Sequence, residues 1–122
     1  MTMMEEDQDR EERIEMEIVV DAYDEQERAL GWYYHLEDAL KFPFLARCSA
    51  SRSISPLRKE DEVEVIGMAP EGECEREMFV FVFWENKKFA VPLSQLECVH
   101  CDDETRQGVE DWHYWVQMGY RF

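Results

Sequence analysis

Positive charge is what this sequence most lacks. Its 122 residues include 13 Lys and Arg against 29 Asp and Glu, which gives a formal net charge of −16. Proteins that bind a nucleic-acid backbone replace its counterions with clusters of basic side chains, and proteins that dock on anionic membranes need similar clusters. We therefore expect neither nucleic acid nor a membrane as a partner. A surface of this charge suits cations or basic proteins.

Long apolar runs and linkers are also missing. The longest apolar run, 78–84, is far shorter than the roughly 18 residues of a membrane span. The first 13 residues are acidic, whereas a signal peptide begins with basic residues and continues with an apolar stretch. With four cysteines, the sequence predicts a cytoplasmic protein with reduced thiols. Without repeats or Pro-, Gly- or Ser-rich linkers, we expect a monomer with one folded domain, 13–122, after a flexible acidic segment, 1–12.

Motifs of the common catalytic sites are absent. The sequence has no G-x-S-x-G elbow, no Gly-rich phosphate loop and no H-E-x-x-H pair. His35 and His113 have no recognisable nucleophile as a partner. The sequence therefore indicates a protein that is not an enzyme.

The spacing of apolar residues predicts an α+β fold. Helical periodicity is found at 12–23, at 24–40 after a cap at Asp21 or Asp24, and at 102–116 after a cap at Asp102 or Asp103. Strand patterns are found at 45–53, 62–68, 78–84 and 89–91, followed by a short helical turn at 92–96. Because 78–84 is apolar throughout, we expect a central strand buried on both faces. Together these elements predict a small SH3-like curled β-sheet or barrel of four to five strands, flanked by N-terminal and C-terminal helices.

The most unusual local feature is an acidic loop, 71–77 (EGECERE), between two predicted strands. Near the end of the second helix, Glu37 and Asp38 lie where the helix dipole disfavours acids that lack a cation. Ca²⁺ takes six to eight oxygen ligands, many of them carboxylates. The sequence therefore predicts a main Ca²⁺ site, although a solvated acidic loop is the alternative. Its candidate ligands are Glu37, Asp38, Glu71, Glu73, Glu75 and Glu77.

Two further clusters have competing interpretations. Asp102, Asp103 and Glu104 are typical of a helix N-terminus, where acids cap free N–H groups, and they are also a candidate for a weak second cation site. Cys98 and Cys101 have the spacing of a zinc or redox pair. A zinc site would need Cys48, Cys74 and His113 to converge on them, so reduced surface thiols are the simpler interpretation.

Eight segments of the sequence match the pattern of a known protein family. They are 20–23 (VDAY), 31–38 (GWYYHLED), 42–44 (FPF), 55–57 (SPL), 61–70 (DEVEVIGMAP), 74–75 (CE), 90–96 (AVPLSQL) and 110–115 (EDWHYW). With them, the sequence resembles the small cyanobacterial calcium-binding (CcbP-like) family, which is linked to heterocyst differentiation. The resemblance implies a compact, strand-rich protein without an EF-hand. It also implies Ca²⁺ binding through acidic side chains, with the family's acidic positions at Asp38, Glu71, Glu73, Glu75 and Glu77.

Two hypotheses about function follow. In the first, the protein is a non-EF-hand Ca²⁺ buffer or sensor whose clustered carboxylates bind the ion. In the second, it is an acidic interaction module that binds a basic protein partner, with the N-terminal block 5–17 as the contact region. The 71–77 loop is needed only in the first.

Overall fold

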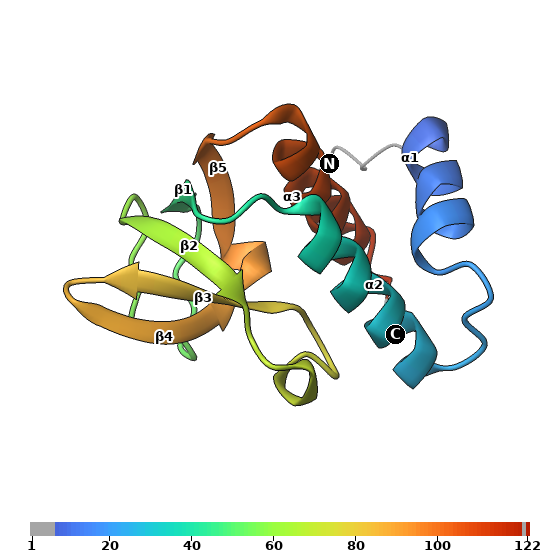
Figure 1. The fold of residues 1–122 in the computed structure, drawn as a ribbon, viewed down its shortest axis with the longest axis horizontal. Coiled ribbons are helices and arrows are strands. Elements are labelled where there is room, and N and C mark those ends of the chain that lie inside the picture. The colour runs from blue at the N-terminus through green and yellow to red at the C-terminus, as the bar shows by residue number, and fades with distance from the viewer. Residues whose placement is uncertain (1–6, 121) are drawn as a thin grey trace, which may run out of the picture.

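The computed structural model describes residues 7–120 and 122, and within them the chain forms an α+β fold (Figure 1). The helices are α1 (Gln8–Arg13), η1 (Ile14–Ile18, a π-helix), α2 (Glu25–Ala39), η2 (Glu71–Glu73), η3 (Leu93–Gln95) and α3 (Asp103–Gln117). The strands are β1 (Phe44–Cys48), β2 (Glu62–Met68), β3 (Phe79–Trp84), β4 (Lys87–Pro92) and β5 (Leu96–His100). The predicted α+β class is confirmed.

The five strands form one antiparallel sheet in the order β4-β3-β2-β1-β5. Because β4 and β5 are its two edges, the sheet is open, which excludes the closed barrel and leaves the curled sheet of the prediction. The fifth strand, β5, was not predicted, because its segment contains Cys98 of the Cys98/Cys101 pair. It pairs with β1 through Ala46 and Cys98. The turn between β3 and β4 consists of Glu85 and Asn86, both with positive φ, as expected for a two-residue hairpin.

The prediction that 78–84 is a central strand buried on both faces is wrong. β3 is second from the edge, and its residues alternate in exposure. Val80 and Val82 are fully buried, whereas Phe83 is 45% exposed. The run is continuously apolar because aromatic side chains also occupy the open face, where the Lys88 ammonium lies 4.4 Å from the centre of the Phe81 ring.

The core lies between the sheet and the two long helices. Trp32 of α2 meets Trp112 of α3 edge to face, with ring centres 5.1 Å apart. Asp24 caps α2 by accepting a 2.8 Å hydrogen bond from the Glu27 N–H, and α2 ends before the Phe42-Pro43 bond, as predicted. Among the described residues, no helix is both long and apolar enough to cross a membrane.

The N-terminal helix differs from its prediction. It begins after the cap residue Asp7 and ends at Ile18, whereas one helix over 12–23 was expected. The chain turns at 19–22, where Asp21 has a φ of +59°. Residues 1–6 lie outside the described residues, so the flexibility of 1–12 stays a prediction, although Gln8–Arg13 is helical. Figure 1 shows α1 on the side of the two long helices away from the sheet.

Candidate metal site

The acidic loop 71–77 connects β2 to β3 and packs along α2. The Tyr33 hydroxyl donates a 2.8 Å hydrogen bond to the Ala69 carbonyl just before the loop. One residue further along α2, the Tyr34 hydroxyl donates a 2.8 Å hydrogen bond to Oε2 of Glu71. Two adjacent tyrosines therefore fix where the loop begins.

Cys74 fixes the other part of the loop. Its side chain is buried, and its Sγ accepts a 3.3 Å hydrogen bond from the Phe79 N–H. Burial raises the pKa of this thiol, so it stays protonated and uncharged. Because Cys74 points inward, its neighbours Glu73 and Glu75 are left exposed.

Between α2 and the acidic loop lies a cleft of about 450 Å³. Three carboxylate side chains line it, Glu25 from α2 and Glu71 and Glu75 from the loop. The remaining lining residues are Gln26, Ala29, Leu30, Tyr33, Gly72, Cys74 and Arg76. Carboxylate oxygens are hard ligands, so this donor set fits Ca²⁺ better than a metal that prefers sulfur or nitrogen.

The two phenols beside the cleft, Tyr33 and Tyr34, have raised pKa values. The pKa of Tyr33 is raised, mainly by burial and then by Glu37, with a contribution from Glu71. The pKa of Tyr34 is raised, first by its hydrogen bond to Glu71 and also by the charge of Glu37. Glu37 and Glu71 therefore act on the same pair of side chains, although they lie on different elements.

The predicted ligands do not all share this location. Glu77 forms a bidentate ion pair with Arg52, with N–O distances of 2.9 and 3.1 Å. Glu73 is exposed on η2 and does not line the cleft. Asp38 lies near the end of α2, where the Lys41 ammonium donates to its carbonyl. Within 7–120 and 122, no three Asp, Glu, His or Cys side chains are already grouped to hold a metal ion.

Three residues beside the cleft, Glu25, Tyr33 and Tyr34, are not among the predicted ligands. Glu25 lies in the first turn of α2, where acids are common for dipole reasons and give no sign of a second role. Tyr33 belongs to the buried side of α2, whereas Tyr34 is 52% exposed. The position of Tyr34 outside the apolar stripe of the helix is the sequence feature that could have indicated a role beside the loop.

Comparison with known proteins identifies the family. The profile of the calcium-binding family CcbP, described as "Calcium binding", matches residues 12–116. The chain belongs to the CcbP family. The crystal structure of Anabaena CcbP is 43% identical, covers 100% of both chains and has a TM-score of 0.88. A structure described as a calcium binding protein in the calcium-binding form is 42% identical, covers 95% of both chains and has a TM-score of 0.85. No curated protein sequence matches the chain.

The second acidic cluster of this CcbP-family chain caps α3. Asp102 accepts a 2.8 Å hydrogen bond from the Thr105 N–H, and this bond holds the pKa of its carboxyl group below the usual value. Glu104 lies 3.7 Å from the Lys41 ammonium. The capping interpretation explains Asp102, and the weak second cation site with Asp103 and Glu104 stays a prediction.

The cysteine pair has the properties of ordinary thiols. Cys98 and Cys101 are both free and half-buried. The pKa of Cys98 is raised, first by burial and then by its contact with Cys101, whereas redox thiols need a lowered pKa. The His113 ring nitrogen Nε2 lies 2.5 Å from the Leu96 carbonyl oxygen. The convergence that zinc would require does not occur among the described residues.

Proposed function

We propose that this protein buffers or senses Ca²⁺ by binding the ion in the cleft between α2 and the acidic loop. The observation that supports this most is that Glu25, Glu71 and Glu75 line one cleft in a chain of a calcium-binding family. Glu37 adds charge from α2 and the exposed Glu73 adds charge on the loop, whereas Glu77 is already paired with Arg52.

Binding would draw the carboxylates together. They repel one another without the ion, and a divalent cation removes that repulsion while backbone carbonyls and water complete its six to eight ligands. Glu71 must turn from the Tyr34 hydroxyl if both of its oxygens are to face the ion. The proposal therefore includes a local rearrangement of the acidic loop against α2.

The compartment and the oligomeric state belong to the same proposal. All four cysteines are free, which suits the reducing cytoplasm. We infer a monomer there, because each copy has the same strong negative charge and copies would repel one another.

The test is isothermal titration of chelator-treated protein with CaCl₂. The double substitution E71Q/E75Q removes two cleft carboxylates and should weaken Ca²⁺ binding about tenfold or more, equivalent to about 1.4 kcal/mol. E62Q/E64Q makes the same change in net charge on β2 and should leave the affinity nearly unchanged. Equal affinities for E71Q/E75Q and the unmodified protein would exclude the cleft as the site.

Competition with Mg²⁺ tests the choice of ion. Mg²⁺ demands strict octahedral geometry and gives up its water reluctantly, so a flexible carboxylate cleft should favour Ca²⁺. Equal displacement of Ca²⁺ by Mg²⁺ would instead indicate a solvated acidic loop that attracts any divalent cation.

A further inference from the structure

Three large apolar side chains are exposed within eight residues at the N-terminal end of the fold. Met16 is 70% exposed, Val20 is 50% exposed and Tyr23 is 82% exposed. We call the segment 12–23 that bears them the N-terminal face. Single exposed apolar residues are ordinary, whereas a group on one short segment is typical of an interaction site. Figure 1 places this segment at the end of the molecule away from the sheet.

Acidic side chains alternate with these apolar groups. Glu12, Glu15 and Asp21 are exposed, and none of them forms an ion pair within the part of the chain that the structure describes. Glu17 is exposed as well, and its charge adds to the hydrogen bond with Asp111 that raises the pKa of the Arg13 guanidinium. The face therefore combines apolar side chains with negative charge.

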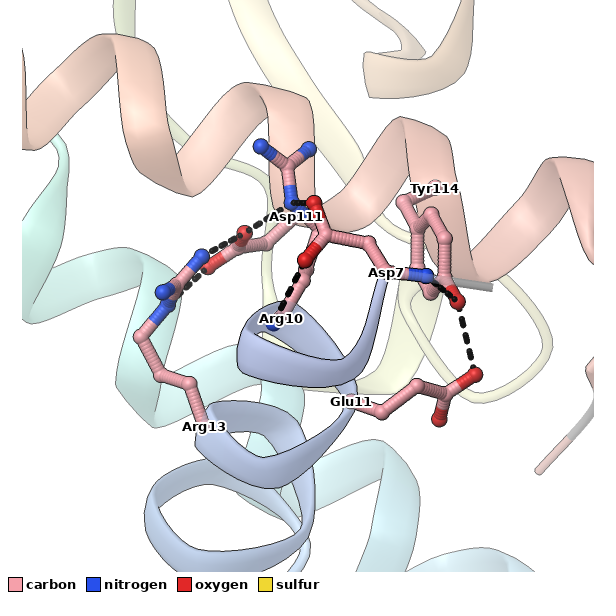
Figure 2. A network of polar contacts seen from close by, with 6 residues as sticks. All are labelled: Asp7, Arg10, Glu11, Arg13, Asp111 and Tyr114. Atoms are coloured by element: carbon pink, nitrogen blue, oxygen red, sulfur yellow. Dashed lines mark hydrogen bonds and ion pairs between the residues drawn. The ribbon is translucent and has the colours of Figure 1, made fainter. Parts of the chain in front are cut away.

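The arginines of this region turn inward. Arg13 donates two hydrogen bonds to Asp111, at 3.0 and 2.6 Å, and Arg10 lies 3.3 Å from the same carboxylate (Figure 2). Arg28 donates to the carbonyl of Phe122 at the other end of the chain. These three cations are paired with Asp7, Asp111 and the Phe122 carbonyl, and none of them forms an ion pair with Glu12, Glu15 or Asp21.

The same network anchors α1, from which the N-terminal face continues. Asp111 is fully buried, and its pairing with Arg10 and Arg13 anchors α1 to α3. Glu11 adds a second anchor, since its Oε1 accepts hydrogen bonds from the Tyr114 hydroxyl at 2.8 Å and the Tyr120 hydroxyl at 2.5 Å. The helical part of the face therefore loses little conformational entropy when a partner binds.

We propose that the N-terminal face is a docking surface for a basic amphipathic segment of another protein. Lys and Arg of the partner would meet Glu12, Glu15 and Asp21, and its apolar side chains would cover Met16 and Tyr23. Charge complementarity selects this partner. Nucleic acid, anionic lipid and a second copy of this face are all negatively charged, so the acidic face repels them. The inference goes beyond Ca²⁺ binding, for which exposed apolar side chains have no use.

The probe is a synthetic amphipathic helix of about 15 residues, with Leu and Trp on one face and Lys on the other. It is titrated into ¹⁵N-labelled full-length protein at about 0.15 M NaCl with excess EDTA, so that surface electrostatics are screened and the Ca²⁺ cleft is empty. We expect amide shifts concentrated at 12–24. A scrambled peptide of the same composition, which lacks an apolar face, should bind at least tenfold more weakly.

Two variants separate the face from the remaining surface. M16S/V20S/Y23S should weaken binding of the probe about tenfold or more, whereas L45S/F83S, which removes two exposed apolar groups from the sheet, should leave it unchanged. E12Q/E15Q/D21N should reduce both the affinity and its salt dependence. Absence of binding, equal binding of the scrambled peptide, or equal loss in L45S/F83S would overturn the proposal. So would a dimer that forms through this face without peptide.

Discussion

Gly31 is the position where η1 crosses α2. A Cβ atom added there would lie 2.4 Å from the carbonyl oxygen of Ile18, and this backbone atom cannot move aside as a flexible side chain would. Gly31→Ala should therefore displace η1 and lower the free energy of unfolding by about 1–3 kcal/mol, measured by urea denaturation. Gly67→Ala is the control, because its Cβ would meet nothing within 4 Å. Equal stability of the two variants would contradict this packing.

His35 makes stability depend on pH. It lies beside Trp32 with ring centres 6.2 Å apart, and burial lowers its pKa below the ordinary 6.5. Asp111, Glu17 and Asp38 oppose this shift without reversing it. The unfolded chain therefore binds the proton more readily, so stability that depends on the neutral ring is present above about pH 6.5 and is lost as the pH falls below it.

His35→Gln should remove this dependence. The free energy of unfolding of the unmodified protein should fall relative to that of the variant between about pH 7.5 and pH 5.5. Urea denaturation of both proteins at the two pH values measures the difference. A difference that stays constant would show that His35 does not titrate differently in the folded and unfolded states.

Arg10 and Arg13 of α1 form ion pairs with the buried Asp111 of α3. Asp111 has no exposed surface and faces both Arg10 and Arg13. Asp111→Asn leaves two cations beside a neutral group and should cost about 3 kcal/mol, since breaking a buried pair typically costs 3–5 kcal/mol. Hydrogen exchange should also become faster in α1 and η1 than in the sheet.

The exposed neighbour Glu110 provides the control for this prediction. Glu110→Gln makes the same change of charge one residue away and should be nearly neutral in urea denaturation. Unchanged exchange rates in α1 for Asp111→Asn would mean that apolar packing of Ile14 and Ile18 alone holds the segment.

The elements were predictable wherever local chemistry sets them. Asp24 and Asp102 are short acids before helical periodicity, and both cap their helices. The end of the first helix was not predictable, because the turn at Asp21 and the close contact at Gly31 depend on packing against α2. Burial of the 78–84 strand was overestimated, since an apolar run does not reveal that its second face lacks a covering layer.

The candidate site was predictable only in part. The acidic loop was visible as alternating carboxylates, and of the residues between them only Cys74 is buried. The ion pair between Glu77 and Arg52 and the position of Glu25 beside the acidic loop could not be predicted. Both bring together residues that are far apart in the sequence. Distance along the chain hides tertiary contacts from any local pattern.

For the whole molecule, the net charge of −16 opposes compactness. The Debye length falls from about 30 Å at 0.01 M salt to about 8 Å at 0.15 M, so added NaCl should screen repulsion between distant surface acids. We therefore expect the Tm of Ca²⁺-free protein to rise over this range, measured by circular dichroism. A constant or falling Tm would mean that internal pairs such as Arg13–Asp111 already outweigh the repulsion.

Ca²⁺ should stabilise the protein beyond this screening. About 1 mM CaCl₂ adds almost no ionic strength to a 0.15 M NaCl solution, so a further rise in Tm must come from binding to the folded state. MgCl₂ at the same concentration is the control, because it screens equally and fits a carboxylate cleft less well. In E71Q/E75Q the increment due to Ca²⁺ should disappear while the increment due to NaCl remains. If Mg²⁺ raised the Tm as much as Ca²⁺, the stabilisation would come from the charge of the molecule as a whole rather than from the cleft beside α2.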